Sequence, residues 1–375
     1  MQYLTPTMLR SALIFCFMLL FISATQSVNL KVKESARVEL PVLYYLKLKG
    51  SIGTHLPITM ELNKTDSFLT GHYYYDKIGH HIQLHGKIKR DGSFVMDESN
   101  SKGKITGNFS GKFSSAKNAA GIWKNPKGDK KFTFQVTANN EGAAEIILKD
   151  YSKKNCERIH FLKNKKDRED SMYDSSCSVH TLIVPVVTLT DKNAEKKINE
   201  CILNSFLPVE NGKRKTIADY TNDIFLENGE YYKEINENFT VSQNDKSILS
   251  IDFGFNEYSE GAAHGTYGLT LLNFDISTGK SITINDIILP GMEKKLNTIA
   301  EKLFYDTNGN ESWFFEPGEF SLNNNFSLKP DGLWFVFNIY EIGPYSSGAP
   351  EVFVPFSQIK DLIRKDGILS RFNIQ

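Results

Sequence analysis

Cysteine is scarce in this sequence, which has four in 375 residues. Cys16 lies in an apolar run near the N-terminus, and the others are Cys156, Cys177 and Cys201. No CxxC pair occurs, so the spacing does not indicate a metal or redox role for these thiols. In an oxidising compartment we expect Cys156 and Cys177 to form a disulfide. We expect Cys201, on a predicted helix, to be a buried small hydrophobe.

An excess of charge of either sign is also missing, because Lys+Arg and Asp+Glu both number 44. Nothing in this balance would attract nucleic acid, so we expect no nucleic-acid partner. The charge is uneven, however, and residues 149–168 are markedly basic. We interpret residues 140–178 as a basic connector, either a solvated linker or a long hairpin with a solvated outer face.

Long apolar runs are limited to residues 11–23 (SALIFCFMLLFIS). At about 13 residues this run is shorter than the roughly 20 that a membrane-spanning helix needs. Arg10 precedes it and the small residues Ala24 and Ser27 follow, as in a cleaved secretory signal over residues 1–27. Cys16 follows Phe15, which does not suit a lipoprotein. We expect a periplasmic or secreted protein, which would be attached to a membrane only if this signal stayed uncleaved.

Residues 28–139 are predicted to be an all-β domain, a small antiparallel barrel or meander. Short alternating runs recur at spacings of about 8 to 12 residues, separated by turns rich in Gly, Asn and Asp. The predicted strands are residues 56–63, 68–75, 81–89, 93–97, 105–109 and 131–137. Phrases such as Ile105–Phe109 and Gly121–Trp123 loosely resemble those of avidin-like and lipocalin-like barrels. We expect bulky side chains to fill the barrel; an open cavity lined by Tyr73, Tyr75 and Trp123 would instead indicate a small ligand.

Four of the eight histidines cluster at residues 72–85, namely His72, His80, His81 and His85, which raises the question of a metal site. His81 and His85 share a strand face but are too far apart to bind one ion. His72 and His81 could meet across a hairpin turn at residues 76–79. No third ligand has a suitable spacing, so we expect a polar, solvated strand face and no metal.

Residues 179–375 are predicted to be an α+β domain. Strands are expected at residues 179–190, 239–242, 248–257, 267–276, 281–284, 326–328, 333–340 and 352–354. Helices are expected after Asp191, around residues 217–225, around residues 292–303, and from Ser357 to Gly367. Hairpins with separate helices favour an antiparallel sheet with helices packed on one face.

Four sequence blocks in this domain carry a resemblance to a known family. They are YSEGAAHGTY at residues 258–267, NFDISTGK at 273–280, LKPDGL at 328–333, and YEIGPYSSG at 340–348 followed by VPF at 354–356. Together they resemble an extracytoplasmic domain of unknown function at the C-terminus of the sigma-V anti-sigma factor. The same domain occurs beside the catalytic domain of some secreted peptidoglycan deacetylases. The resemblance covers about residues 179–365.

The resemblance implies a bacterial cell-wall context. In the anti-sigma factor the domain is a receptor that binds lysozyme, and in the deacetylases it is an accessory module. The present sequence departs from both, because only about ten residues precede the apolar run and no deacetylase domain is recognisable. We therefore expect no direct regulation of a sigma factor.

His264 is the one catalytic candidate, with Glu260 and Asp275 near it in sequence. A histidine with a carboxylate is the minimum for acid–base chemistry. No GxSxG or HExxH pattern accompanies it. Its neighbours are small, and we interpret His264 as filling a gap at a tight backbone crossing. We accordingly expect no catalytic residue and no cofactor.

Gly343, Pro344, Tyr345 and Gly348 are the predicted binding residues. Proline fixes the backbone and glycine permits a sharp loop. Tyr345 would then either be presented as an aromatic anchor or pack beneath its own loop.

The sequence thus predicts an exported binding protein of the cell envelope. Its partner would be lysozyme, another wall-active protein or a cell-wall glycan. The alternatives are an envelope-directed hydrolase centred on His264 and a structural envelope protein with a small-ligand β-barrel.

Overall fold

A computed structural model describes residues 41, 43–100, 103–156, 177–226, 233–308 and 320–372, with backbone alone for 223–226. The predicted signal sequence lies outside these residues, as does the segment 157–176 of the basic connector. Residues 38–375 belong to one compact unit. No helix in the described ranges combines the length and the apolar character needed to cross a bilayer.

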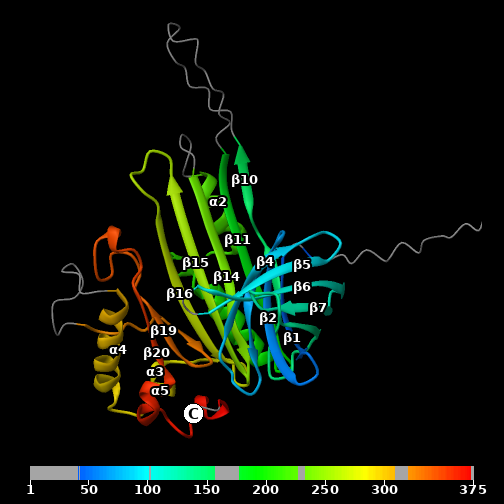
Figure 1. Ribbon diagram of the computed structural model, residues 1–375. Coiled ribbons are helices and arrows are strands. Elements are labelled where there is room, and N and C mark those ends of the chain that lie inside the picture. The colour runs from blue at the N-terminus through cyan, green and yellow to red at the C-terminus, as the bar shows by residue number, and fades with distance from the viewer. Residues whose placement is uncertain are drawn as a thin grey trace, which may run out of the picture. The chain divides into compact units, whose positions relative to one another are not determined.

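The N-terminal part is a closed antiparallel barrel of eight strands (Figure 1). Each strand pairs with the next along the chain, and β1 pairs with β8 to close the barrel. The strands are β1 (Leu43–Ile52), β2 (Leu56–Thr65), β3 (Phe68–Tyr75), β4 (Ile82–Ile88), β5 (Ser93–Ser99), β6 (Ile105–Ser115), β7 (Asn118–Lys124) and β8 (Lys131–Ala138).

Aromatic and aliphatic side chains fill the interior of the barrel. The Phe109 ring lies with its centroid 5.2 Å from that of Tyr73 and 5.1 Å from that of Phe134, in edge-to-face contacts. Phe113 and Phe94 continue the packing at 5.3 Å. The expected filled barrel is therefore what the structure has, and these rings hold the strands together by burial and by favourable ring geometry.

The C-terminal part is built on a mixed seven-stranded sheet. Its strands are β9 (Glu145–Asp150), β10 (Lys153–Cys156), β11 (Cys177–Thr188), β14 (Lys233–Asp245), β15 (Ile248–Ser259), β16 (Thr266–Asp275) and β17 (Lys280–Ser281). β11 and β14 are parallel, whereas every other pair is antiparallel. Residues 145–156 of the predicted connector thus contribute two strands to this sheet.

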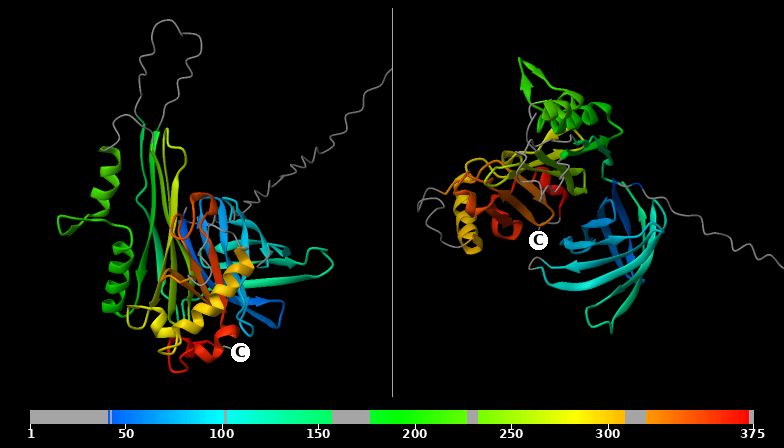
Figure 2. Two further views of the ribbon diagram at one scale, coloured as in Figure 1. Left: turned by 90° about the vertical axis from the view of Figure 1, so that its left-hand side faces the viewer. Right: turned by 90° about the horizontal axis from the view of Figure 1, so that it is seen from above.

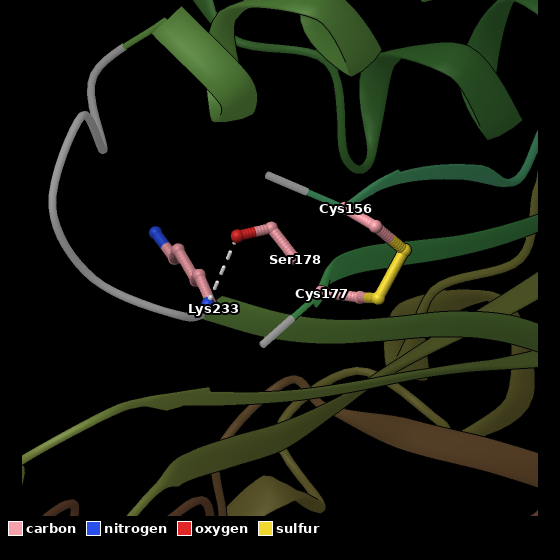
Figure 3. The surroundings of a disulfide bond; sticks show 4 residues. All are labelled: Cys156, Cys177, Ser178 and Lys233. Atoms are coloured by element: carbon pink, nitrogen blue, oxygen red, sulfur yellow. Dashed lines mark hydrogen bonds between the residues drawn. A yellow bond between two sulfur atoms is a disulfide. The ribbon is translucent and has the colours of Figure 1, made fainter. Parts of the chain in front are cut away.

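The expected disulfide between Cys156 and Cys177 is present (Figure 3). The two residues face each other in the β10–β11 register, so the bond joins one arm of a hairpin to the other. The neighbouring Ser178 hydroxyl accepts a hydrogen bond of 3.2 Å from the Lys233 backbone N–H, which ties this end of β11 to β14.

Two helices lie on one face of the sheet (Figure 2). α1 (Lys192–Asn204) begins after Asp191, whose side chain accepts from the N–H groups of Asn193 and Ala194, and α2 (Ile217–Leu226) follows the short hairpin of β12 (Val209–Glu210) and β13 (Lys213–Arg214). On α1, Ala194, Ile198 and Ile202 are buried. Cys201 is half-buried rather than buried, because it lies at the margin of this stripe, 3.6 Å from the Ser281 hydroxyl.

The other face of the sheet carries a three-stranded sheet with the remaining helices (Figure 2). β18 (Phe326–Lys329), β19 (Gly332–Val336) and β20 (Glu351–Pro355) pack with α4 (Glu293–Asn308) around a second core. The short elements α3 (Ile284–Ile287), η1 (Tyr345–Ser347), α5 (Phe356–Ile359), η2 (Lys360–Leu362) and η3 (Ile368–Arg371) complete it.

The helix predicted from Ser357 to Gly367 was wrong. α5 begins after Pro355 and ends at Ile359, and a 3-10 turn follows. The chain then becomes extended at Ile363, which forms a β-bridge with Ile288. Buried residues at Phe356, Ile359 and Leu362 are spaced by three, which suits a 3-10 turn better than an α-helix.

Two predicted strands also end differently. The strand expected over residues 281–284 stops at Ser281, because Thr283 and Asp286 form a capping box that starts α3. The strand expected over residues 333–340 stops at Val336. Beyond it the chain turns, and this turn forms part of the candidate site.

Candidate binding site

Two segments far apart in sequence meet at the edge of the large sheet. The first is the connection between β15 and β16, residues 260–265. The second follows β19 and runs from residue 337 to 350. The first lies within the block YSEGAAHGTY quoted above, and the second contains the block YEIGPYSSG.

Asparagine side chains attach the second segment to β16. The Asn338 side chain accepts from the Leu269 N–H at 2.8 Å and donates to the Leu269 carbonyl at 3.1 Å. Asn325 makes a similar pair, accepting from Leu271 N–H at 2.9 Å and donating to the Leu269 carbonyl at 3.0 Å. These amides satisfy backbone groups of an edge strand that would otherwise be left without partners.

A turn at residues 338–341 presents Tyr340. The Glu341 N–H donates to the Asn338 carbonyl at 3.0 Å, which closes a β-turn. Tyr340 has φ of 62° in the third position of this turn, where glycine is the usual residue. The Glu341 carboxylate holds the turn by accepting from the Asn338 N–H at 2.7 Å and the Asn323 side chain at 2.8 Å. A bulky residue in this conformation stores about 1–3 kcal/mol of strain.

Four aromatic side chains then form a cluster, the aromatic platform, made of His264, Tyr267, Tyr340 and Tyr345. His264 stacks on Tyr345 with ring centroids 3.8 Å apart and planes at 21°. Tyr267 meets Tyr345 edge-on at 5.9 Å, and Tyr340 lies 5.8 Å from Tyr345. Tyr340 is 61% exposed and His264 is exposed, whereas Tyr267 and Tyr345 are half-buried.

The protonation of His264 follows from its contacts. Its Nδ1 lies 2.9 Å from the Gly265 carbonyl oxygen, which can only accept, so Nδ1 carries a proton. Its Nε2 lies 3.3 Å from the Tyr340 hydroxyl. His264 is thus oriented by one backbone acceptor and one tyrosine.

His264 does not fill a gap at a backbone crossing, as the sequence suggested, because it is exposed and stacked on Tyr345. Asp275 lies at the opposite end of β16 and forms a two-pronged ion pair with Arg371 at 3.0 and 3.1 Å. The polar contacts of His264 therefore do not include the carboxylate expected from Asp275.

The predicted binding residues lie around Tyr345. Pro344, with φ of −68°, precedes the 3-10 turn η1, and Gly348 follows it with φ of 70°. Gly348 adopts backbone angles that other residues rarely take, and a Cβ at this position would lie 3.6 Å from the Tyr267 hydroxyl. Gly343 is half-buried and lies between the turns that carry Tyr340 and Tyr345. Tyr345 is half-buried, which is intermediate between an exposed aromatic anchor and a ring packed beneath its own loop.

Sequence reasoning missed two rings of the cluster, the 61% exposed Tyr340 and the half-buried Tyr267. Both stand in the quoted blocks, five residues before Tyr345 and three after His264. Recurrence of aromatic residues around glycine-rich turns was the available signal. The two rings come together because the side chains of Asn325 and Asn338 form hydrogen bonds with the backbone of β16. No local sequence pattern reveals these long-range contacts.

A second polar cluster lies between the barrel and the sheet. His72 and His81 do meet across the β3–β4 hairpin, stacked at 3.7 Å, and Tyr74 stacks on His81 at 5.4 Å. Burial, and next the neighbouring His72, hold the pKa of His81 well below its ordinary value. A small recess here is lined by Glu61, Tyr74, Gly79, His81, Gln243, Asp245, Lys246, Pro330 and Phe372. Within the described ranges, no group of three potential ligands is arranged to hold a metal ion.

One segment of the chain matches the sequence model of a known family. Residues 285–357 match the sequence model of DUF3298, a family of proteins of unknown function. This DUF3298 segment runs from α3 to the start of α5 and includes Tyr340, Gly343, Pro344, Tyr345 and Gly348. His264 and Tyr267 lie before it. No curated protein matches the chain.

Two crystal structures of DUF3298 proteins are similar to this chain. One, from Bacteroides fragilis NCTC 9343, is 19% identical, covers 63% of this chain and 99% of its own length, and has a TM-score of 0.46. The other, from Pseudomonas aeruginosa PAO1, is 15% identical, covers 58% and 94% respectively, and has a TM-score of 0.43.

Proposed function

We propose that this chain is an exported binding protein of the bacterial cell envelope, and that the aromatic platform contacts its partner. The partner is lysozyme or another wall-active protein, or a cell-wall glycan. One observation carries the proposal. Two separate loops and the start of β16 bring four aromatic rings together at an exposed sheet edge, and one ring is held there on a strained backbone.

The chemistry of the platform suits recognition better than catalysis. Tyrosine offers a large rigid contact surface with a polar end, and such residues dominate binding interfaces. Strained backbone persists where the surrounding structure enforces it, which is common at ligand-binding sites. Glu341 and the asparagines at 323 and 338 supply that enforcement through hydrogen bonds.

The cell-envelope setting rests on the sequence. The N-terminal apolar run has the form of a secretory signal, and the C-terminal blocks resemble the lysozyme receptor and deacetylase-associated domain. The disulfide is consistent with an oxidising compartment. The hydrolase centred on His264 has less support, because the described contacts of His264 are a carbonyl and a tyrosine hydroxyl.

The test is a calorimetric titration of the purified mature protein with lysozyme and, separately, with soluble peptidoglycan fragments. Tyr345→Ala removes the ring that contacts the other three and should weaken binding by about tenfold or more, the loss typical of a central interface residue. Phe68→Ala is the matched control, because Phe68 is a 52% exposed aromatic residue on the barrel, outside the platform.

Saturable binding that Tyr345→Ala weakens and Phe68→Ala does not would support the proposal and identify the surface. If both variants bind as tightly as the wild type, the partner binds a surface other than the aromatic platform. No saturation with either partner at micromolar concentration would contradict the proposal in both of its forms.

A further inference from the structure

One end of the barrel holds a buried carboxylate without a charged partner. Glu98, on β5, is 3% exposed. It accepts hydrogen bonds of 2.5 Å from the Tyr73 hydroxyl and 2.9 Å from the Trp123 indole N–H. Both donors are neutral. Among the described residues, no lysine, arginine or histidine forms an ion pair with it. Fully buried glutamates are rare unless they are paired, so this one lacks the usual compensation.

Each of the two donor rings packs against a further aromatic ring. Tyr73 and Tyr75 meet edge-on at 5.6 Å, and Trp123 and Phe132 stack at 6.0 Å. The cation–π contacts of the described residues involve the rings of Phe68, Phe372 and Trp334, and none of these four. The faces of aromatic rings attract cations, so the Glu98 end of the barrel combines two features that favour positive charge.

Gly107 leaves room for this arrangement. A Cβ at residue 107 would lie 2.6 Å from both the Glu98 Oε1 and the Trp123 Nε1. A residue larger than glycine at position 107 would therefore push the Glu98 carboxylate and the Trp123 indole apart. The interior beyond Glu98 is filled, because Phe109 and Phe113 are completely buried. A ligand would therefore be received at the end of the barrel, where Phe132 is 43% exposed and Tyr75 and Trp123 are half-buried.

We propose that the Glu98 end of the barrel binds an organic cation, an amine or a quaternary ammonium group. The positive group contacts the Glu98 carboxylate, and its alkyl substituents lie against Trp123, Phe132 and Tyr75. A metal ion does not fit this site, because hard cations take six or more oxygen ligands and Glu98 is a single carboxylate. The site is separate from the aromatic platform. Its proposed ligand does not depend on the partner proposed for the platform.

The test is a calorimetric titration of the full mature chain with two probes, choline and n-butylammonium. The neutral isostere of choline, 3,3-dimethylbutan-1-ol, has the same shape without the charge and is the ligand control. We expect saturable binding of at least one cation and none of the isostere. A second readout is the Trp123 indole signal in an NMR spectrum, assigned with Trp123→Phe, which should shift with the cation.

Glu98→Gln keeps the size of the side chain and removes its charge, so it should weaken cation binding by about tenfold or more. Asp97→Asn is the matched control: it alters the adjacent residue of β5, which accepts from Asn108 at 2.8 Å, and it should bind normally. If Glu98→Gln does not fold, Phe132→Leu replaces it in the titration, because a substitution at this exposed position should leave the protein folded. It should weaken binding several-fold.

Three results would overturn the proposal. The first is no saturation by either cation at millimolar concentration. The second is equal binding of the neutral isostere, which would make the contact simply apolar. The third is unchanged affinity in the folded Glu98→Gln variant or, where that variant does not fold, in Phe132→Leu.

Discussion

Tyr340 is the residue at which local preference and tertiary structure disagree most plainly. Its φ of 62° belongs to glycine in a turn of this kind, and yet a large aromatic residue stands there, 61% exposed. Turn propensity does not explain that choice, whereas the contacts of the ring with Tyr345 and His264 account for its place in the cluster. Glycine would form the turn more easily, but it would leave the aromatic platform without this ring.

Replacing Tyr340 tests this account. Tyr340→Gly relieves the strain of the left-handed conformation, so the free energy of unfolding should stay the same or rise by about 1 kcal/mol. Tyr340→Ala keeps the strain and should give no such rise. Both variants lack the ring and should bind the platform's partner about tenfold more weakly. Denaturant unfolding and calorimetry measure the two effects. A clear loss of stability in Tyr340→Gly would show instead that the ring serves the fold.

At the scale of elements, the disulfide fixes an edge of the large sheet. β10 is a strand of four residues, and among the strands that the structure describes it pairs only with β11. Hydrogen bonding over so short a strand is weak, and the covalent bond at Cys156 and Cys177 keeps its register. It closes a loop with a sequence separation of 21 residues, most of which lies outside the described ranges.

Removal of both cysteines should therefore destabilise the protein. For a loop of this length, chain entropy predicts that Cys156→Ser/Cys177→Ser lowers the free energy of unfolding by about 3 kcal/mol. Cys201→Ser is the control and should have a much smaller effect, because that thiol is half-buried and unbridged. Thiol titration of the denatured, unreduced mature protein should detect Cys201 alone. Reaction of all three thiols would contradict the bridge.

At the scale of the whole molecule, buried polar contacts join the barrel to the large sheet. The Lys47 ammonium, fully buried, lies 2.5 Å from the Asp245 carboxylate at the end of β14, and the Tyr74 hydroxyl also donates to Asp245. Glu61 accepts from the Tyr45 hydroxyl at 2.7 Å and from the Asn244 N–H at 3.2 Å. Removing one member would leave a buried group without its partner, so barrel and sheet should unfold together.

The free energy of unfolding should depend on pH through the Lys47–Asp245 contact between the barrel and the large sheet. Burial alone would raise the pKa of Asp245, but the Lys47 charge and the hydrogen bonds from Lys47 and Tyr74 outweigh it and lower that pKa below the ordinary 3.8. Because the folded-state pKa is depressed, the contribution is fully present above pH 3.8 and is lost as the pH falls through the lower folded value.

Asp245→Asn should lower the free energy of unfolding at neutral pH by about 3–5 kcal/mol, since it leaves Lys47 buried without its counter-charge. Between about pH 4 and pH 2 its stability should fall less steeply than that of the wild type. Asp129→Asn, in an exposed turn, is the control. Urea unfolding at a series of pH values measures both effects, and parallel curves for Asp245→Asn and the wild type would refute the linkage.

The strand pattern of the barrel was readable in the sequence because each strand pairs with its neighbour along the chain. Alternation and turn residues are local signals, and they placed β2 and β3 within two residues of their observed ends. The cysteine pair could be predicted because few cysteines were available. The final helix could not, because the bridge between Ile363 and Ile288 competes with helical hydrogen bonding, and the sequence near Ser357 carries no sign of it.

The candidate site was readable only in part. Pro344 and Tyr345 stood out by their residue types, whereas the role of Tyr340 depends on a turn closed by Glu341 and docked on β16 through Asn338. Glu98 resembled any other strand residue until the barrel closed and placed it beside Tyr73 and Trp123.

The sequence by itself indicated most of the element types, a β-rich part followed by an α+β part, and the disulfide, because local propensity, periodicity and composition act over a few residues. Tertiary structure alone decided which aromatic rings meet, which carboxylate is buried without a counter-charge and how barrel and sheet are joined. The physical reason is that these contacts link residues tens to hundreds of positions apart. Their energies depend on burial and geometry that exist only once the sheets have formed.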